Sequence, residues 1–131
     1  MQINSAKDLK VYKKSYSLAM QIFEVSKNFP KEEKYSLTDQ IRRSSRSVCL
    51  NLREAWSKRR YKAHFVNKLI PTCRDDGENS ETDSSLDFAK DCGYINLDVH
   101  HTLVTKNREV GKMLGTMIKN PGLFVTKNSD V

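Results

Sequence analysis

The sequence lacks the features that mark membrane-spanning, secreted and disulfide-rich proteins. Its apolar stretches are only a few residues long, whereas a helix needs roughly 20 to cross a bilayer. The first residues, MQINSAKDLK, contain no apolar signal segment. The three cysteines, Cys49, Cys73 and Cys92, are odd in number and lack metal-ligand spacing. We therefore expect a cytoplasmic protein with reduced thiols and no membrane partner.

Motifs for catalysis and cofactor binding are missing as well. The sequence has no glycine-rich phosphate loop and no nucleophile elbow. A ferritin-like metal site needs an E-x-x-H pair, and none occurs. Asp98 and His101 have i, i+3 spacing, but an acid in the first turn of a helix is favoured by the helix dipole alone. We expect a protein that is not an enzyme and that binds no metal or other cofactor.

The sequence does contain helical periodicity, with breaks between the periodic segments. The first predicted helix covers about residues 5–28 and ends at Phe29-Pro30, because a residue before proline avoids helical geometry. Its predicted apolar stripe is Leu9, Tyr12, Tyr16, Ala19, Phe23 and Ser26. The second predicted helix covers about residues 32–58. Its predicted stripe is Leu37, Ile41, Val48, Leu52, Ala55 and, at the edge, Trp56.

Two more helices are predicted in the second half. The third covers about residues 61–91, with Phe65 and Leu69 inward in its first half; Pro71 predicts a kink or a break. Its second half carries three inward residues, Leu86, Phe88 and Ala89. Gly93 is suited to a helix C-cap and Asn96 to the N-cap of the fourth helix. The stripe of that helix is Leu97, Leu103, Val104, Val110, Leu114, Met117 and Ile118.

Four helices with short connections predict an all-α fold, an up-down-up-down four-helix bundle. The chain length suits a single domain over residues 1–131. We expect its core to cover about residues 5–119, because Asn120-Pro121-Gly122 stops the last helix. The tail, residues 120–131, has little to hold it in place.

Charge is unevenly distributed along the chain. The net charge is +7, and residues 31–74 carry +8 whereas residues 75–91 carry −6. Because consecutive helices are antiparallel in such a bundle, the acidic half of the third helix should lie beside Arg42, Arg43 and Arg46. We expect it to neutralise them within the bundle or across a subunit contact. The bases farther along have no acidic run opposite them, so we expect them to contact nucleic-acid phosphates without reading sequence. This predicted nucleic-acid-binding set is Arg53, Lys58, Arg59, Arg60, Lys62 and Lys68.

Aromatic residues accompany this basic stretch. Stacking on single-stranded bases would require exposed rings. The spacing of Trp56, Tyr61 and Phe65 places all three near the core, so stacking is the weaker hypothesis.

Small and polar residues at helical spacing let another helix approach closely and predict a subunit contact. The predicted oligomer interface is Gln40, Arg43, Ser44, Ser47, Asn51, Gly77, Ser80, Glu81 and Ser84. A single isolated bundle would not need a helix with two such faces. We therefore expect a homo-oligomer.

A block of residues resembles a known family. Phe29-Pro30, Gln40-Ile41-Arg42-Arg43 and Asn51-Leu52 match the proteins related to those encoded in intervening sequences of bacterial 23S rRNA, and the similarity covers about residues 8–119. It implies a ring-like homopentamer that is not an enzyme. More distantly, the chain is similar to the accessory variability determinant proteins that partner reverse transcriptases in retroelements. The chain departs from the family pattern at Arg53, Trp56 and Pro71.

Two functions remain open from the sequence. One is a non-enzymatic oligomer that binds RNA or DNA through a basic surface. The alternative is a protein–protein scaffold or accessory subunit, for example for a reverse transcriptase, with no direct role at nucleic acid. Exposed and unpaired bases between Arg53 and Lys68 would favour the first.

Overall fold

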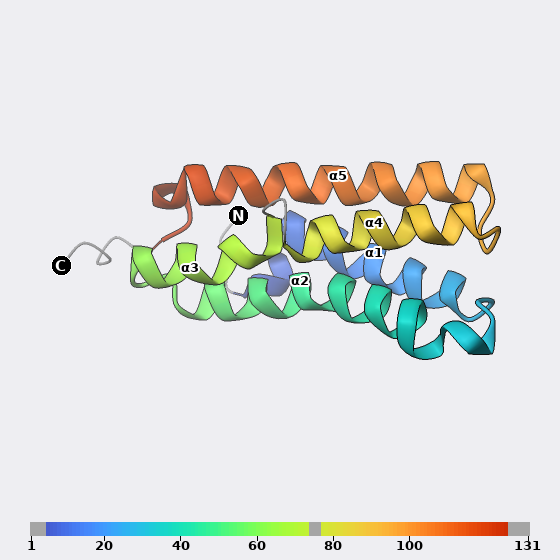
Figure 1. Cartoon of the computed structure of the whole chain (residues 1–131). Helices are drawn as coiled ribbons and strands as arrows, with labels where there is room; N and C mark the ends of the chain where they lie inside the picture. Colours follow the sequence, from blue (N-terminus) through green and yellow to red (C-terminus); the bar gives the residue numbers. More distant parts are fainter. Residues whose placement is uncertain (1–4, 74–76, 126–131) are drawn as a thin grey trace.

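The computed structural model describes residues 5–73 and 77–125, and this part of the chain is built from α-helices, without strands (Figure 1). Its five helices are α1 (Lys10–Ser26), α2 (Asp39–Ser57), α3 (Lys62–Cys73), α4 (Glu78–Asp91) and α5 (Leu97–Lys119). The predicted all-α class is confirmed. Of the helices described, none is both long and apolar enough to cross a membrane.

The helices lie side by side along one long axis (Figure 1). α1 packs against α2 and α5, and α2 also packs against α3 and α4. α5 packs against α3 and α4, which follow one another along the same side of the molecule. A turn of π-helix, Lys34–Thr38, leads into α2. Each long helix therefore contributes one face to a shared interior.

The third predicted helix is two helices. α3 ends at Cys73 and α4 begins at Glu78, and residues 74–76 between them lie outside the described part. Pro71 sits inside the last turn of α3. The structure thus has two helices where one helix, kinked or broken near Pro71, was predicted, and a kink at Pro71 itself stays a prediction.

The interior consists of two apolar clusters. The cluster at the α3 end contains Ala6, Leu9, Val11, Val48, Leu52, Ala55, Trp56, Phe65, Leu69, Val110, Leu114 and Met117. The cluster at the other end contains Leu18, Ile22, Phe29, Leu37, Ile41, Leu86, Ala89, Ile95, Leu103 and Val104. The predicted stripe of α2 is confirmed, because all its members are buried.

A buried polar layer separates the two clusters. It consists of Ser15, Ser44, Ser45, Thr82 and Asn107, joined by the half-buried Asn79. Ser44 and Thr82 share a hydroxyl hydrogen bond of 2.7 Å between α2 and α4. The Asn79 amide donates to the Asn107 carbonyl oxygens at 2.9 and 3.0 Å, and Asn107 donates back to the Asn79 backbone at 2.8 Å. These bonds satisfy polar groups that would otherwise be costly to bury.

The loop between α4 and α5 is formed by the residues that the sequence indicated. Gly93 has a φ of +80°, a conformation that favours glycine. Its amide donates to Lys90, and the Tyr94 amide donates to Ala89 at 2.8 Å, which together form a Schellman cap. The Asn96 side chain then accepts from the Val99 amide at 2.8 Å as the N-cap of α5. Both predicted caps are confirmed.

The predicted stripe of α1 is confirmed at Leu9, Ala19 and Ser26, which are buried, and is displaced elsewhere. Val11, Leu18 and Ile22 are buried beside them, whereas Tyr16 is 54% exposed and Phe23 is half-buried. The aromatic residues lie at the edge of the buried face, because their rings can pack there and still contact water. Leu97 was likewise predicted inward and is exposed.

The start of the predicted tail is packed rather than free. Pro121–Leu123 form a short 3₁₀ turn after α5. Phe124 then stacks on Phe65 with ring centroids 6.2 Å apart. The expectation that nothing holds the tail is therefore wrong for this stretch, and residues 126–131 lie outside the described part.

Candidate nucleic-acid and subunit interfaces

The predicted nucleic-acid-binding residues gather where α2 turns into α3, and we call them the basic rim: Arg53, Lys58, Arg59, Arg60, Lys62 and Lys68. The turn closes through backbone bonds from Lys58 to Glu54 and Ala55 and from Tyr61 to Lys58. Because the chain reverses here, bases from two helices and their connection share one end of the molecule (Figure 1). Arg53, Lys58, Arg60 and Lys62 are exposed there.

Two members of the basic rim are held by other groups. Lys68 Nζ lies 2.6 Å from Glu54 Oε2, so this ion pair joins α3 to α2. The hydrogen bond from Lys68, followed by its charge, lowers the pKa of Glu54. Arg59 lies over the Trp56 ring at 4.2 Å and donates to the Trp56 carbonyl at 2.8 Å. Among the residues that the structure describes, the rim members without an ion pair are therefore those on the turn and toward the ends of the two helices.

The aromatic residues near the rim differ in exposure. Trp56 and Phe65 are buried, as predicted. Tyr61 is 49% exposed, so its predicted place near the core is wrong. It lies directly before α3, and Arg60 approaches its ring to 5.9 Å. One ring is thus available beside a free cation for contact with a base.

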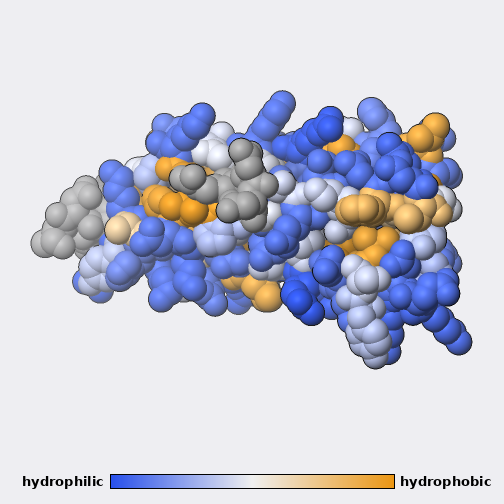
Figure 2. Space-filling model, viewed as in Figure 1, coloured by the Kyte–Doolittle hydropathy of each residue, from blue (hydrophilic) through white to orange (hydrophobic). Residues whose placement is uncertain are grey.

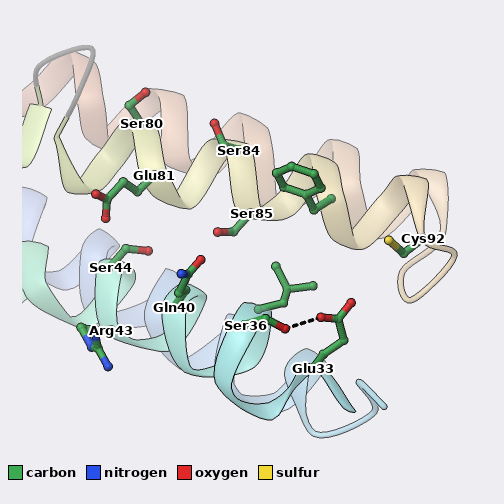
Figure 3. Close-up of a pocket in the computed structure, with 12 residues that line it drawn as sticks. Glu33, Ser36, Gln40, Arg43, Ser44, Ser80, Glu81, Ser84, Ser85 and Cys92 are labelled. Carbon is green, nitrogen blue, oxygen red and sulfur yellow. Dashed lines mark hydrogen bonds between the residues drawn. The ribbon is translucent and has the colours of Figure 1, made fainter. Parts of the chain in front are cut away.

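A groove of about 650 Å³ lies between the first half of α2 and α4, and we call it the α2–α4 groove (Figure 3). Its lining residues are Glu33, Ser36, Leu37, Gln40, Arg43, Ser44, Ser80, Glu81, Ser84, Ser85, Phe88 and Cys92. Six of the nine predicted interface residues are among them. The structure does not bring Ser47, Asn51 and Gly77 into this lining.

Some of the small polar residues serve contacts inside the chain. Ser44 is buried and bonds to Thr82, so it brings α2 close to α4 within one copy. Gly77 is buried just before α4. The Asn51 amide donates to the Ser47 carbonyl of its own helix at 2.9 Å. The expectation that a single bundle has no use for this face is therefore wrong for Ser44.

The apolar part of the groove was missed in the sequence. Phe88 was predicted to face inward, but it is 65% exposed at the groove. Figure 2 shows a pale orange patch toward the α4–α5 turn, where the surface has few blue atoms. Phe88 directly precedes the buried Ala89. Because successive residues of a helix are 100° apart around its axis, Phe88 lies on a different side of α4. The groove is therefore amphipathic.

Residues of opposite charge line the two walls of the groove. Arg43 belongs to α2 and Glu81 to α4, and Figure 3 shows the Arg43 side chain pointing away from α4. Burial, followed by the like charge of Glu81, raises the pKa of Glu78, while Ser47 and Arg43 act in the opposite direction. The α4 wall thus carries acidic groups that repel one another, and a further cation would stabilise their charged forms.

Arg42 and Arg46 do not face the acidic half of the third predicted helix. Both lie on the α1 side of α2, where their guanidinium groups approach the Phe23 ring to 4.8 and 5.5 Å. Four residues separate them, so they share one face of α2, whereas Arg43 lines the groove. The predicted pairing is therefore wrong for these two arginines within one copy of the chain, and a pairing between subunits stays a prediction.

The described part of the chain contains no group of three or more His, Cys, Asp or Glu side chains arranged to hold a metal ion. The half-buried His100 ring is 2.8 Å from Asp87.

Comparisons with known proteins agree on one family. The model of a family described as 23S rRNA-intervening sequence protein matches residues 7–116. Among solved structures, the chain is similar to a crystal structure at 1.70 Å of a protein with unknown function from the S23 ribosomal protein family of Bacteroides thetaiotaomicron. The two are 30% identical with a TM-score of 0.72, and the match covers 83% of this chain and 98% of the other. No curated protein matches the chain.

Proposed function

The chain belongs to the 23S rRNA-intervening sequence protein family, and we propose that it is a non-enzymatic, oligomeric four-helix bundle that binds RNA or DNA through its basic rim. In this bundle α3 and α4 together form the third of four up-and-down elements. The family resemblance stated from Gln40-Ile41-Arg42-Arg43 and its neighbouring residues is confirmed. The family's printed name connects it with rRNA, which makes RNA the first nucleic acid to test.

The observation that carries the proposal is the group of unpaired bases at the α2–α3 turn. Arg53, Lys58, Arg60 and Lys62 form no ion pair within the described residues, whereas Lys14, Lys27 and Lys68 do. Clustered cations without acids attract a polyanion and release its counterions on contact. Such contacts go to the phosphate backbone, so they carry no sequence information.

The α2–α4 groove supports self-association. It presents an exposed aromatic ring next to an arginine and a glutamate on opposite walls, and such a surface can complement a copy of itself. We propose that a second copy covers this groove in a homo-oligomer. The family resemblance implies five copies. Repetition of the basic rim in every copy would then strengthen weak phosphate contacts through avidity.

A second candidate function is a protein–protein scaffold, for example an accessory subunit of a reverse transcriptase. The same α2–α4 groove favours it, because an amphipathic groove with an exposed ring can receive a partner's helix. The two candidates differ at the basic rim, which a scaffold would not need. They therefore separate in a direct binding measurement.

The test is the fluorescence anisotropy of labelled RNA and DNA oligonucleotides of about 20 nucleotides. Binding should weaken at least about tenfold between about 50 and about 200 mM salt, because each neutralised phosphate of a single strand adds about 0.7 to the salt slope. A variant with Arg60→Glu and Lys62→Glu should lose binding, whereas the matched variant with Arg108→Glu and Lys112→Glu on α5 should keep most of it. Light scattering should show the same oligomer for all three. No binding by the unmodified chain at low salt would exclude the nucleic-acid function and leave the scaffold.

A further inference from the structure

Three cations converge on one aromatic ring at the α1–α2 contact. Arg42 and Lys27 each lie 4.8 Å from the centroid of the Phe23 ring, and Arg46 lies 5.5 Å from it. Phe23 projects from α1, and both arginines project from α2, so the cluster bridges the two helices. A single cation over a phenyl ring is a common contact. Three cations around the same ring concentrate positive charge at the α1–α2 contact.

One arginine of this cluster is fixed in orientation. Arg42 Nε donates to Ser26 Oγ at 2.8 Å, and Ser26 is buried and in turn donates to the Phe23 carbonyl at 3.0 Å. This chain holds the guanidinium plane in place. Its two terminal nitrogens have no partner within the described residues, although together they form the fork that binds an anion in a bidentate manner.

The cluster has little negative charge to balance it. Lys27 pairs with Glu24 at 3.2 Å, but no carboxylate of the described residues lies within 4.0 Å of Arg42 or Arg46. Like charges held together on one ring repel one another, and an anion between them removes that repulsion. Binding of an anion such as phosphate would therefore stabilise this cluster.

The cluster continues along α2 toward the basic rim. Arg46 and Arg53 are exposed, and with Arg42 they recur at steps of four and seven residues on the side of α2 that faces α1. The eleven residues from Arg42 to Arg53 span about 16 Å along the helix axis, since each residue rises about 1.5 Å. In a duplex each strand places one phosphate about every 3.4 Å along the helix axis, and a more extended single strand still places more than one phosphate within this length.

We infer that Arg42, Arg46 and Arg53 form a phosphate-binding track, organised around Phe23, along the α1–α2 face. This inference rests on the proposed function and extends it. The strand runs along the length of α2 to the basic rim, so the rim is only one end of the bound surface. The ligand is a single-stranded nucleic acid bound by its phosphates, with Arg42 as the fixed fork and Arg46 as the exposed contact.

A linear polyanion suits this track better than an acidic peptide does. The three arginines lie on a straight helix face, and phosphates are part of the strand's own backbone. Each acidic side chain would have to be ordered separately to meet the same positions, at a cost in side-chain entropy. Polyglutamate of matched charge is therefore the appropriate competitor.

The experiment measures the affinity of the full chain for labelled oligouridine of about 20 nucleotides over a range of salt. Arg46→Glu should weaken binding at least tenfold, and Arg46→Gln should lower the salt slope by about 1. Arg108→Glu, which makes the same charge change on α5, should alter affinity less than threefold. Phe23→Leu keeps every charge but removes the shared ring, and it should weaken binding by about threefold through the loss of the cation contacts.

The outcomes separate this inference from the function on which it rests. If the unmodified chain binds no RNA, both fail. If it binds RNA, loses binding on Arg60→Glu with Lys62→Glu, and is unaffected by Arg46→Glu, the track is excluded and the rim alone remains. Equal losses for Arg46→Glu and Arg108→Glu would show that only total charge matters and overturn the track. Polyglutamate displacing RNA more effectively than unlabelled oligouridine would also overturn its assignment to phosphate. Circular dichroism and light scattering confirm that each variant is folded and assembled.

Discussion

The Tyr94 hydroxyl donates a hydrogen bond of 2.7 Å to Glu33 Oε2 and thereby joins the two loops at one end of the molecule. Tyr94 follows Gly93 in the α4–α5 loop, and Glu33 lies in the turn before α2. This bond is the main reason that the pKa of Tyr94 is raised to about 12. A bond from Ser36, followed by the one from Tyr94, lowers the pKa of Glu33. The Tyr94 ring also packs against Phe29, with centroids 5.5 Å apart.

Replacing Tyr94 with Phe should lower the melting temperature at neutral pH. Because the pKa of Glu33 is lowered on folding, its contribution is present above its unfolded pKa and is lost as the pH falls through the folded pKa. Because that of Tyr94 is raised, its contribution is lost as the pH rises from about 10 towards 12. The difference in melting temperature between Tyr94→Phe and the unmodified chain should therefore be greatest at pH values above the unfolded pKa of Glu33 and below about 10. It should shrink outside this range. Thermal unfolding followed by circular dichroism over a range of pH measures it.

Tyr35→Phe is the matched control, since Tyr35 is 77% exposed and makes no side-chain hydrogen bond within the described residues. It should leave the melting temperature unchanged. In an ultraviolet titration of the folded chain, the tyrosine signal at about pH 12 should disappear from Tyr94→Phe alone. Equal behaviour of the two variants would contradict the loop-joining bond.

Gly111→Ala should destabilise the chain by about 1–3 kcal/mol, the usual cost of overpacking a tight contact. A Cβ added there would lie 2.6 Å from Asn79 Oδ1, and the Asn79 amide is held by its bonds to Asn107. Gly115→Ala is the control, because nothing lies within 4 Å of its added Cβ. It should stabilise α5 by up to about 1 kcal/mol through helix propensity. Chemical unfolding measures both, and a stabilised Gly111→Ala would contradict the close approach of α4.

Cys92 should react with a thiol reagent about a hundredfold faster than Cys49 in a Cys73→Ser background. Burial raises the pKa of the Cys49 thiol to about 11, so its reactive thiolate is scarce at neutral pH. Cys92 is exposed at the α2–α4 groove.

If a second copy covers this groove, concentrating the protein should slow the labelling of Cys92. A concentration-independent rate, in a protein that light scattering shows to be oligomeric, would place the subunit contact elsewhere.

Glu54→Gln should strengthen RNA binding about two- to threefold, because it releases Lys68 to contact phosphate. Glu109→Gln is a closely matched control. Glu109 forms an equally short pair of 2.6 Å with Lys14, between α5 and α1, and the substitution changes the net charge by the same amount. Anisotropy titration of both variants distinguishes the effect of releasing Lys68 from the general effect of removing one negative charge. Equal gains would argue against a contact at Lys68.

The residues that determine the fold were largely recognisable in the sequence. Apolar periodicity identified the buried side of α2, and special residues marked the ends of the helices, as Gly93 and Asn96 show. These signals are local, because each depends on residues within one or two turns. The α2–α4 groove was partly predicted for the same reason, through Gln40, Ser80 and Ser84.

The errors arose where a residue's environment depends on another helix. Arg42 and Arg46 were assigned to the acidic segment by charge, but the rotation of α2 turns them toward Phe23. Asn107 was not recognised as interior, since its burial depends on Asn79 lying opposite it. In α1, the predicted stripe was centred on aromatic residues, which lie at the edge of the buried face. Such rotations of about 60–100° are set by packing between helices, which spacing along one chain does not encode.

The buried polar layer has a consequence for how the chain opens. Because Ser44, Thr82 and Asn107 interrupt the apolar contact between the two clusters, we expect the two ends of the molecule to open as separate units of local unfolding. The groove belongs to one unit and the basic rim to the other. Assembly through the groove would then slow amide exchange in its own half, while the half that carries the basic rim keeps its freedom to open and to adapt to an irregular surface.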